Sequence, residues 1–112
     1  MTDVIQSVSR VQGAIVVQLT GDIDLNQSPS FHQALVDLCA EEPDRLIVHL
    51  SRVNYIDSSG VGSLVEIYRR LKRQGRKMIL VAPSKRVGSV LEITKLDKFF
   101  TIVPTEQEAL QL

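Results

Sequence analysis

The sequence alternates between short apolar runs and longer segments in which apolar residues recur with a helical period. The first two runs, DVIQSVSRV and AIVVQLTGDID, are rich in β-branched residues and flank Gln12-Gly13, so they predict two strands joined by a tight turn. Three later runs are short and bounded by polar residues, which is typical of buried strands: RLIVHL, KMILVA and FFTIV. After RLIVHL we expect a loop over residues 51–60.

Helices are predicted between these strands, because apolar positions recur three and four residues apart. The stripe of the first helix is Phe31, Ala34, Leu35 and Leu38. The stripe of the second is Val61, Leu64, Val65, Tyr68 and Leu71. Asn26 or Ser28 can cap the first helix, and Gly75 is placed to end the second.

Two more helices follow towards the end of the chain. Ser84 can cap a third helix, whose apolar positions are Val87, Val90 and Leu91. Thr105 and Glu108 have the spacing of a capping box before a fourth. The order β-β-α-β-α-β-α-β-α predicts a single α/β domain over residues 1–112, with a mixed, mostly parallel sheet.

Composition and charge narrow the classes of partner. The 112 residues carry 13 basic and 13 acidic side chains and only 4% aromatics, so we expect no nucleic-acid partner. The lone Cys39, the lack of an apolar signal core and the short apolar runs favour a cytoplasmic protein without membrane contact. One basic run is either a solvated helix end or a patch for phosphate or an acidic partner: Arg69, Arg70, Lys72, Arg73, Arg76 and Lys77.

Common enzyme motifs are incomplete in this chain. Gly60 and Gly62 lack the third glycine of a dinucleotide loop, because position 65 is Val, and no Gly-Lys-Ser/Thr follows them. The segment IDSSG is not a nucleophile elbow, and the only histidines, His32 and His49, fit structural positions. No cluster has metal-ligand spacing. We therefore expect no enzymatic activity, no metal and no cofactor.

A polar segment, Asp57-Ser58-Ser59-Gly60, precedes the second helix and has two interpretations. All three polar residues can accept hydrogen bonds from the free N–H groups of a helix start. A helix start also favours negative charge, so a phosphate on a serine here would be tolerated by the helix while disturbing a docked partner. Ser58 and Ser59 both lie within reach of the helix start, and these physical considerations do not choose between them.

The surroundings of this segment suggest an interaction surface. Gly60 and Gly62 each cost the helix about 1 kcal/mol relative to Ala, which points to close approach by neighbouring backbone or by a partner. Asp57 would share an acidic surface with Asp22 and Asp24 if the loops 21–26 and 51–60 are neighbours.

The segment VHLSRVNYIDSSGVGSLVEIYRRLKRQGRKMILVA resembles the centre of STAS domains, and specifically the anti-sigma factor antagonists of bacteria. The flanking segments VQLTGDIDLNQSPSF and PSKRVGSVLEITKLDKFFTIVPTEQEAL agree, so the resemblance runs from about Val4 to Leu110. It differs from the family at His49, where Asp or Asn is usual, and at Lys95, where Gly is common.

The resemblance implies a partner-switching mechanism. The unphosphorylated protein would bind an anti-sigma factor that is also a serine kinase, which would release a sigma factor. The kinase would phosphorylate Ser58, supported by Asp57, Ser59 and Gly60, and a metal-dependent serine phosphatase would reverse the step. We expect the partner-binding surface to include Asp22, Asp24, Asn26, Val61, Gly62 and Ser84.

Two other functions stay open on the sequence. The chain could be a STAS interaction module in another signalling or lipid-transport complex, in which the serines only cap the helix. It could also bind a nucleotide or another small ligand through residues 51–62.

Overall fold

The computed structural model describes residues 3–112, so residues 1 and 2 of the expected domain lie outside the described residues. The described residues fold as one α/β domain in the predicted order of elements. These are β1 (Ile5–Val11), β2 (Ala14–Ile23), α1 (Ser28–Cys39), β3 (Arg45–Ile56), α2 (Ser58–Arg73), β4 (Lys77–Val81), α3 (Lys85–Ile93), β5 (Thr101–Val103) and α4 (Glu106–Leu110).

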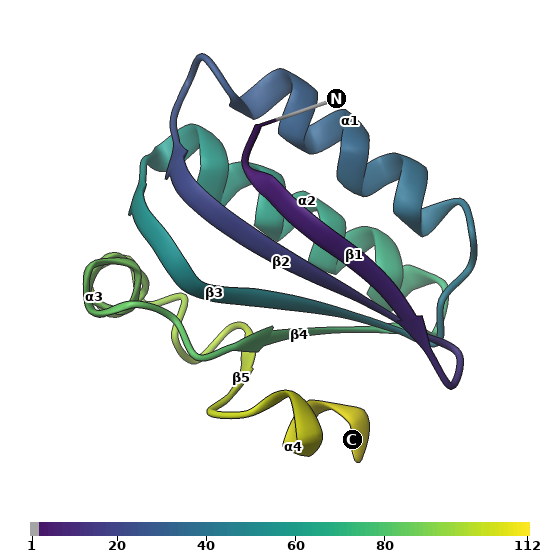
Figure 1. The fold of residues 1–112 in the computed structure, drawn as a ribbon. Helices are drawn as coiled ribbons and strands as arrows, with labels where there is room; N and C mark the ends of the chain where they lie inside the picture. The colour runs from purple at the N-terminus through teal and green to yellow at the C-terminus, as the bar shows by residue number, and fades with distance from the viewer. Residues whose placement is uncertain (1–2) are drawn as a thin grey trace.

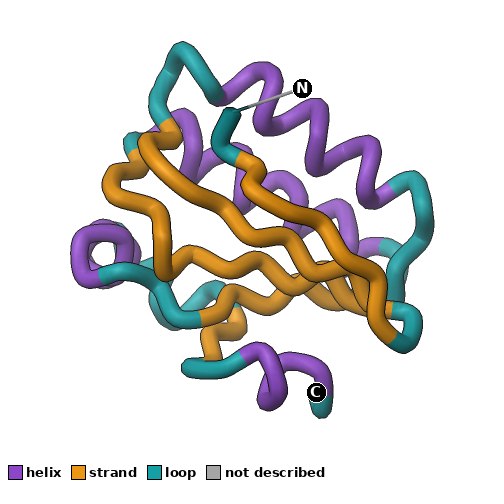
Figure 2. The backbone as a smooth tube through the Cα atoms, viewed as in Figure 1, coloured by secondary structure: helices purple, strands orange, loops and turns teal. Residues whose placement is uncertain are grey.

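The five strands form one sheet in the order β1-β2-β3-β4-β5 (Figure 2). β1 and β2 are antiparallel, and the other three neighbouring pairs are parallel, which confirms the predicted mixed sheet. The turn between β1 and β2 is the predicted one, since Gln12 and Gly13 both have positive φ, at 51° and 84°. Two positive φ angles match the right-handed twist of a two-residue hairpin.

Helices cover the two faces of the sheet unequally (Figure 1). α1 and α2 pack on one face, where the apolar core includes Phe31, Leu35, Leu64, Ile67 and Leu71. Val87 and Leu91 of α3 join this same core, as right-handed crossovers between parallel strands require. The short α4 covers the other face through Ala109. None of the helices formed by residues 3–112 is long and apolar enough to cross a membrane.

Strand β3 is longer than predicted, and the expected loop over residues 51–60 is wrong. Its pairing with β2 continues to Ile56, with two shifts of register. At the first shift β2 advances by two residues, from Gln18 to Thr20, while β3 advances by three, from His49 to Arg52. Such bulges break the alternation by which a strand is recognised in sequence. The last residue of the strand, Ile56, is therefore followed directly by Asp57, the N-cap residue of α2.

The start of α1 also differs from the prediction. Neither Asn26 nor Ser28 caps the helix, because the N-cap position is Gln27, whose side chain makes no capping hydrogen bond. Instead the Asp24 carboxylate accepts from the N–H groups of Asn26, at 3.0 Å, and Gln27, at 3.3 Å. Asp24 thus forms an Asx turn, in which its side chain accepts hydrogen bonds from the backbone just after it, and this turn replaces a side-chain cap.

The remaining helix ends follow the sequence signals. Gly75 has a φ of 72° just after α2, the Ser84 hydroxyl accepts from Val87 N–H at the start of α3, and the Thr105 hydroxyl accepts from Glu108 N–H at the start of α4. α3 ends differently, because Lys95 takes the left-handed conformation with a φ of 62°. Only glycine adopts that conformation without steric cost.

This conformation predicts the effect of a substitution. Lys95→Gly should raise the free energy of unfolding by about 0.5–1 kcal/mol, because relief of the left-handed strain exceeds the added entropy of the unfolded chain. The measurement is the midpoint of urea unfolding. Gly75→Ala is the matched control and should lower that midpoint, and an unchanged midpoint for Lys95→Gly would contradict the strain.

Candidate functional site

The candidate site lies where β2 and β3 end, which is the edge at which open α/β sheets usually carry their sites. Ile23 and Ile56 are paired as the last residues of the two strands. The next backbone N–H along β3, that of Asp57, donates to the carbonyl of Ile23 at 3.2 Å. The start of α2 is thus held against the end of β2.

Asp57 is the N-cap of α2 and uses both carboxylate oxygens. Its Oδ1 accepts from the N–H of Ser59 at 2.9 Å and of Gly60 at 3.2 Å. Its Oδ2 accepts from the N–H of Leu25 at 3.1 Å, in the turn before α1. One side chain therefore joins the helix start to the neighbouring loop.

These contacts also favour the charged form of Asp57. The Ser59 hydroxyl donates to Asp57 Oδ1 at 2.5 Å and makes the largest contribution in lowering the pKa of the carboxyl group. The N–H groups of Gly60, Ser59 and Leu25 lower this pKa further, while partial burial opposes them. Hydrogen bonds to a carboxylate stabilise its ionised form.

The two serines, which the sequence left equivalent, differ in the structure. The hydroxyl of Ser59 is committed to Asp57 and its residue is partly buried. Ser58 is exposed in the first turn of α2, and its hydroxyl makes no hydrogen bond within residues 3–112. Of the two hydroxyls, only that of Ser58 is free to react with another molecule.

Gly60 and Gly62 differ in the space that surrounds their α-carbons. A Cβ atom at Gly60 would lie 2.8 Å from side-chain atoms of both Ile23 and Ile56, so this glycine lets α2 approach the strand ends. A Cβ atom at Gly62 would have no atom within 4 Å beyond its chain neighbours and the backbone of its own helix. Close packing inside the domain therefore explains Gly60, and no packing need inside the domain explains Gly62.

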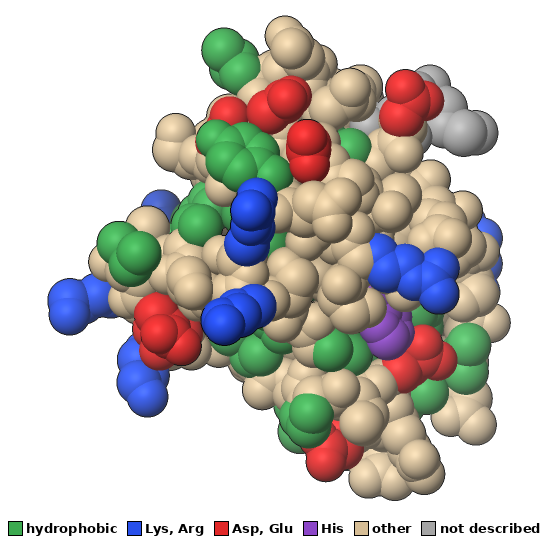
Figure 3. Space-filling view, turned by 60° about the vertical axis from the view of Figure 1, so that its left-hand side comes forward, with side chains coloured by type: hydrophobic (Ala, Val, Ile, Leu, Met, Phe, Trp, Pro, Cys, Tyr) green, Lys and Arg blue, Asp and Glu red, His purple; other side chains and the backbone are tan. Residues whose placement is uncertain are grey.

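The residues expected on a partner surface are only partly accessible. Asp22, Asn26 and Gly62 are exposed, and Asp24 is half-buried in its turn. The expectation that Val61 lies on this surface is wrong, because its side chain is buried against the core. These positions belong to one end of the domain, where acidic side chains gather in Figure 3.

Ser84, also expected on the partner surface, has a structural position. It is half-buried, and besides capping α3 its hydroxyl donates to the carbonyl of Val53 at 2.6 Å. This bond attaches the start of α3 to β3 at Val53, which lies between the two shifts of register.

Two apolar residues beside the site were not anticipated from the sequence. Leu25 is 72% exposed and Tyr55 is 47% exposed, although most large apolar residues of the chain are buried. Leu25 is tied by its N–H to Asp57, and Tyr55 is paired with Asp22 across the strands. Apolar side chains within a polar rim are typical of protein-binding surfaces. In the sequence, the exposure of Tyr55 is indicated only by the interrupted alternation of apolar and polar residues along β3.

The two histidines hold helices in place. His32 lies 3.5 Å from Glu66 between α1 and α2, and His49 lies 2.8 Å from Glu106, which attaches α4 to the sheet. Within the described part of the chain no group of three or more His, Cys, Asp or Glu side chains could hold a metal ion.

Comparison with known proteins identifies relatives across almost the whole chain. Residues 6–109 match the family model described as STAS domain. The anti-sigma-B factor antagonist of Bacillus subtilis is 31% identical over 104 residues, which are 93% of this chain and 94% of that protein.

Solved structures give the same result. An anti-sigma factor antagonist from Mycobacterium paratuberculosis is 30% identical, with a TM-score of 0.85 over 94% of this chain and 89% of that one. SpoIIAA shares the fold at 24% identity, with a TM-score of 0.79 over 93% of this chain and 91% of its own in the unphosphorylated form. Its phosphorylated form has a TM-score of 0.71 at 22% identity, over 94% of this chain and 96% of its own.

The glycine geometry predicts opposite effects of one substitution. Gly60→Ala should lower the free energy of unfolding by about 1–3 kcal/mol, because the new methyl group overlaps two isoleucines. Gly62→Ala should raise it by up to about 1 kcal/mol, because the methyl group meets open space in a helix. Chemical denaturation of both variants tests this, and equal effects would contradict the packing described for Gly60.

The hydrogen bonds of Asp57 predict a pH dependence. Asp57→Ala should cost about 1 kcal/mol at neutral pH through loss of the cap. Because the folded pKa is lowered, the stabilisation by charge is complete above the ordinary aspartate pKa of about 3.9 and is lost as the pH falls through the folded value. Unfolding measured from pH 7 to pH 2 should show the gap between wild type and Asp57→Ala shrinking. Asp57→Asn has no titrating group, so its gap from Asp57→Ala should stay constant.

Proposed function

Because the chain belongs to the STAS domain family and its curated relatives include anti-sigma-B factor antagonists, we propose that it binds an anti-sigma factor and is released by phosphorylation of Ser58. The bound anti-sigma factor is a serine kinase that uses ATP, and its capture frees a sigma factor. The chain itself acts in the cytoplasm as ligand and substrate, and ATP and metal belong to its partners.

The free hydroxyl of Ser58 carries this proposal. It is exposed at a helix start and has no hydrogen-bond partner among the described residues, whereas the neighbouring hydroxyl of Ser59 is bound to Asp57. A serine that only capped the helix would turn its hydroxyl to the free N–H groups, and Asp57 already serves two of those. The capping function and the reactive hydroxyl are thus divided between adjacent residues.

The proposed transfer has a simple balance. Ser58 Oγ attacks the γ-phosphorus of ATP, the bond from that phosphorus to the β,γ-bridging oxygen breaks, and ADP leaves with the electron pair. The hydroxyl proton passes to a base of the kinase. A metal-dependent serine phosphatase reverses the modification by directing water at phosphorus, and the serine oxygen leaves and regains a proton.

The charge of the product explains its release. A phosphate adds about −1.5 to −2 charges at a helix start, which the helix dipole tolerates. The same charge lies beside Asp57 and at the same end of the domain as Asp22 and Asp24, in a surface whose apolar contacts are Leu25 and Tyr55. A partner that fits the unmodified surface would meet a denser negative charge. SpoIIAA has been solved phosphorylated, so this fold accommodates such a group.

Phosphosite mapping tests the proposal directly. After incubation with ATP and an anti-sigma factor serine kinase from the same organism, phosphate should appear on wild type and on Ser59→Ala but not on Ser58→Ala. Ser58→Asp should bind the kinase about 100-fold more weakly, since burying a charge without a partner at an interface that fits an uncharged serine costs several kcal/mol. Titration calorimetry measures that affinity.

Two results would contradict the proposal. One is phosphate on another residue, and the other is unchanged kinase binding by Ser58→Asp. Recovery of a signalling or lipid-transport complex without any kinase would instead favour an interaction module in which no phosphate is used.

A further inference from the structure

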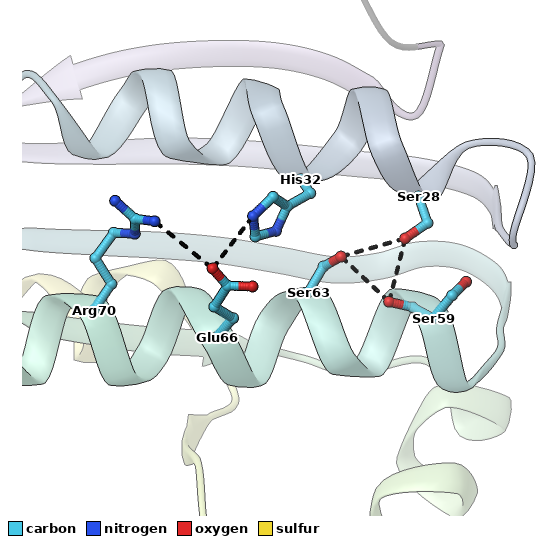
Figure 4. A network of polar contacts seen from close by, with 6 residues as sticks. All are labelled: Ser28, His32, Ser59, Ser63, Glu66 and Arg70. Atoms are coloured by element: carbon cyan, nitrogen blue, oxygen red, sulfur yellow. Dashed lines mark hydrogen bonds and ion pairs between the residues drawn. The ribbon is translucent and has the colours of Figure 1, made fainter.

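Two serines that the proposed switch does not use lie directly beneath it. Ser28, at the start of α1, and Ser63, in the second turn of α2, are 9% and 7% exposed, and no other polar residue among residues 3–112 is buried. Figure 4 shows both hydroxyls pointing to the same place, the backbone at Ser59. Buried hydroxyls are rare enough, and costly enough without partners, that their common target is informative.

The target is the carbonyl oxygen of the residue after Ser58. Ser28 Oγ lies 3.3 Å and Ser63 Oγ 3.2 Å from Ser59 O, and the two hydroxyl oxygens are 3.3 Å apart. Each hydroxyl has one proton, so only two of these three contacts are hydrogen bonds at any moment. Either both serines donate to the carbonyl, or one donates to the other, which donates to the carbonyl. In each arrangement the carbonyl keeps at least one hydroxyl donor.

These bonds complete the fixation of the backbone around Ser58. The peptide plane between Ser58 and Ser59 is held by the Asp57 carboxylate, which accepts the Ser59 N–H at 2.9 Å. The next plane, between Ser59 and Gly60, is held on its N–H side by Asp57. On its carbonyl side, the hydroxyls of Ser28 and Ser63 add to the helical bond that this carbonyl accepts from the backbone N–H four residues on. The hydroxyl of Ser58 is therefore unbound while the backbone that carries it is anchored to α1.

We propose that Ser28 and Ser63 are positioning residues for phosphorylation of Ser58, which act by fixing the Ser59 carbonyl. This inference rests on the proposed function, because it assigns a role in that same transfer. In-line attack on phosphorus requires the nucleophilic oxygen in a narrow range of positions, and displacement by about 1 Å can cost 100-fold in rate. An exposed serine on a loosely held turn would lose that alignment.

A stability role alone makes a different prediction from a positioning role. Replacement of both serines by alanine removes donors and leaves the apolar packing nearly intact, so partner binding should persist. The matched control is Glu66→Gln, at the same helix interface, where Glu66 contacts His32 at 3.5 Å and Arg70 at 3.6 Å but not Ser59 (Figure 4). A general loosening of α1 against α2 would affect both variants alike.

The test is steady-state phosphorylation of Ser58 by an anti-sigma factor serine kinase from the same organism, with radiolabelled ATP. Ser28→Ala/Ser63→Ala should lower kcat at least about tenfold, with KM for the protein substrate within about twofold of wild type. Each single variant should lose much less, because the other serine still serves the carbonyl. Ser28→Ala/Ser63→Thr restores one donor and should recover most of kcat, since a helical Thr can bond the carbonyl four residues back.

Hydrogen–deuterium exchange gives a reading that needs no kinase. Amides in the first turns of α2 should exchange at least about tenfold faster in the double alanine variant and at the wild-type rate in Glu66→Gln. Equal kcat in wild type and the double variant, or unchanged exchange in that variant, would overturn the inference. If wild type itself is not phosphorylated on Ser58, the proposed function fails, and unchanged exchange would overturn the anchoring independently.

Discussion

The free N–H groups at the start of helix α2 are the constraint on which the site depends. Asp57 accepts from two of them, and its other oxygen accepts from Leu25, so one carboxylate joins the helix, the end of β3 and the loop before α1. Its contact with the Ser59 hydroxyl means that, of these two adjacent serines, Ser58 has the free hydroxyl. The accessibility of that serine is thus a by-product of how the helix begins.

Much of the fold could be predicted because its signals are local. Apolar periodicity indicated the first three helices, capping-box spacing indicated the fourth, and β-branched runs with Gln12-Gly13 indicated the first two strands. β3 could not be fully predicted, because two bulges against β2 interrupt its alternation and only the pairing with another strand reveals them. The missed half of β3 is also what brings Tyr55 and Asp57 beside the end of β2.

The site was predictable where one residue acts on its own backbone and less so where elements meet. The capping roles of Asp57, Ser84 and Thr105 follow from position in sequence. The contacts of Gly60 with two strand ends, and the burial of Val61, depend on how closely α2 packs on the sheet. The exposure of Leu25 could not be predicted either, because an apolar residue in a sequence is expected to lie in the core.

Helix α4 depends for its stability on contacts with the rest of the domain. Its five residues are too few to form a stable helix alone, because so few hydrogen bonds do not offset the entropy lost in forming the first turn. Its attachments are the buried Ala109, the contact of His49 with Glu106 and a hydrogen bond from Arg45 to the carbonyl of Leu110. We therefore expect α4, which covers the second sheet face, to open more readily than the face that carries α1, α2 and the serines, because the larger apolar cluster lies on that face. Opening of α4 would then occur on the far side of the sheet from the switch, and we expect it to leave Ser58 in place.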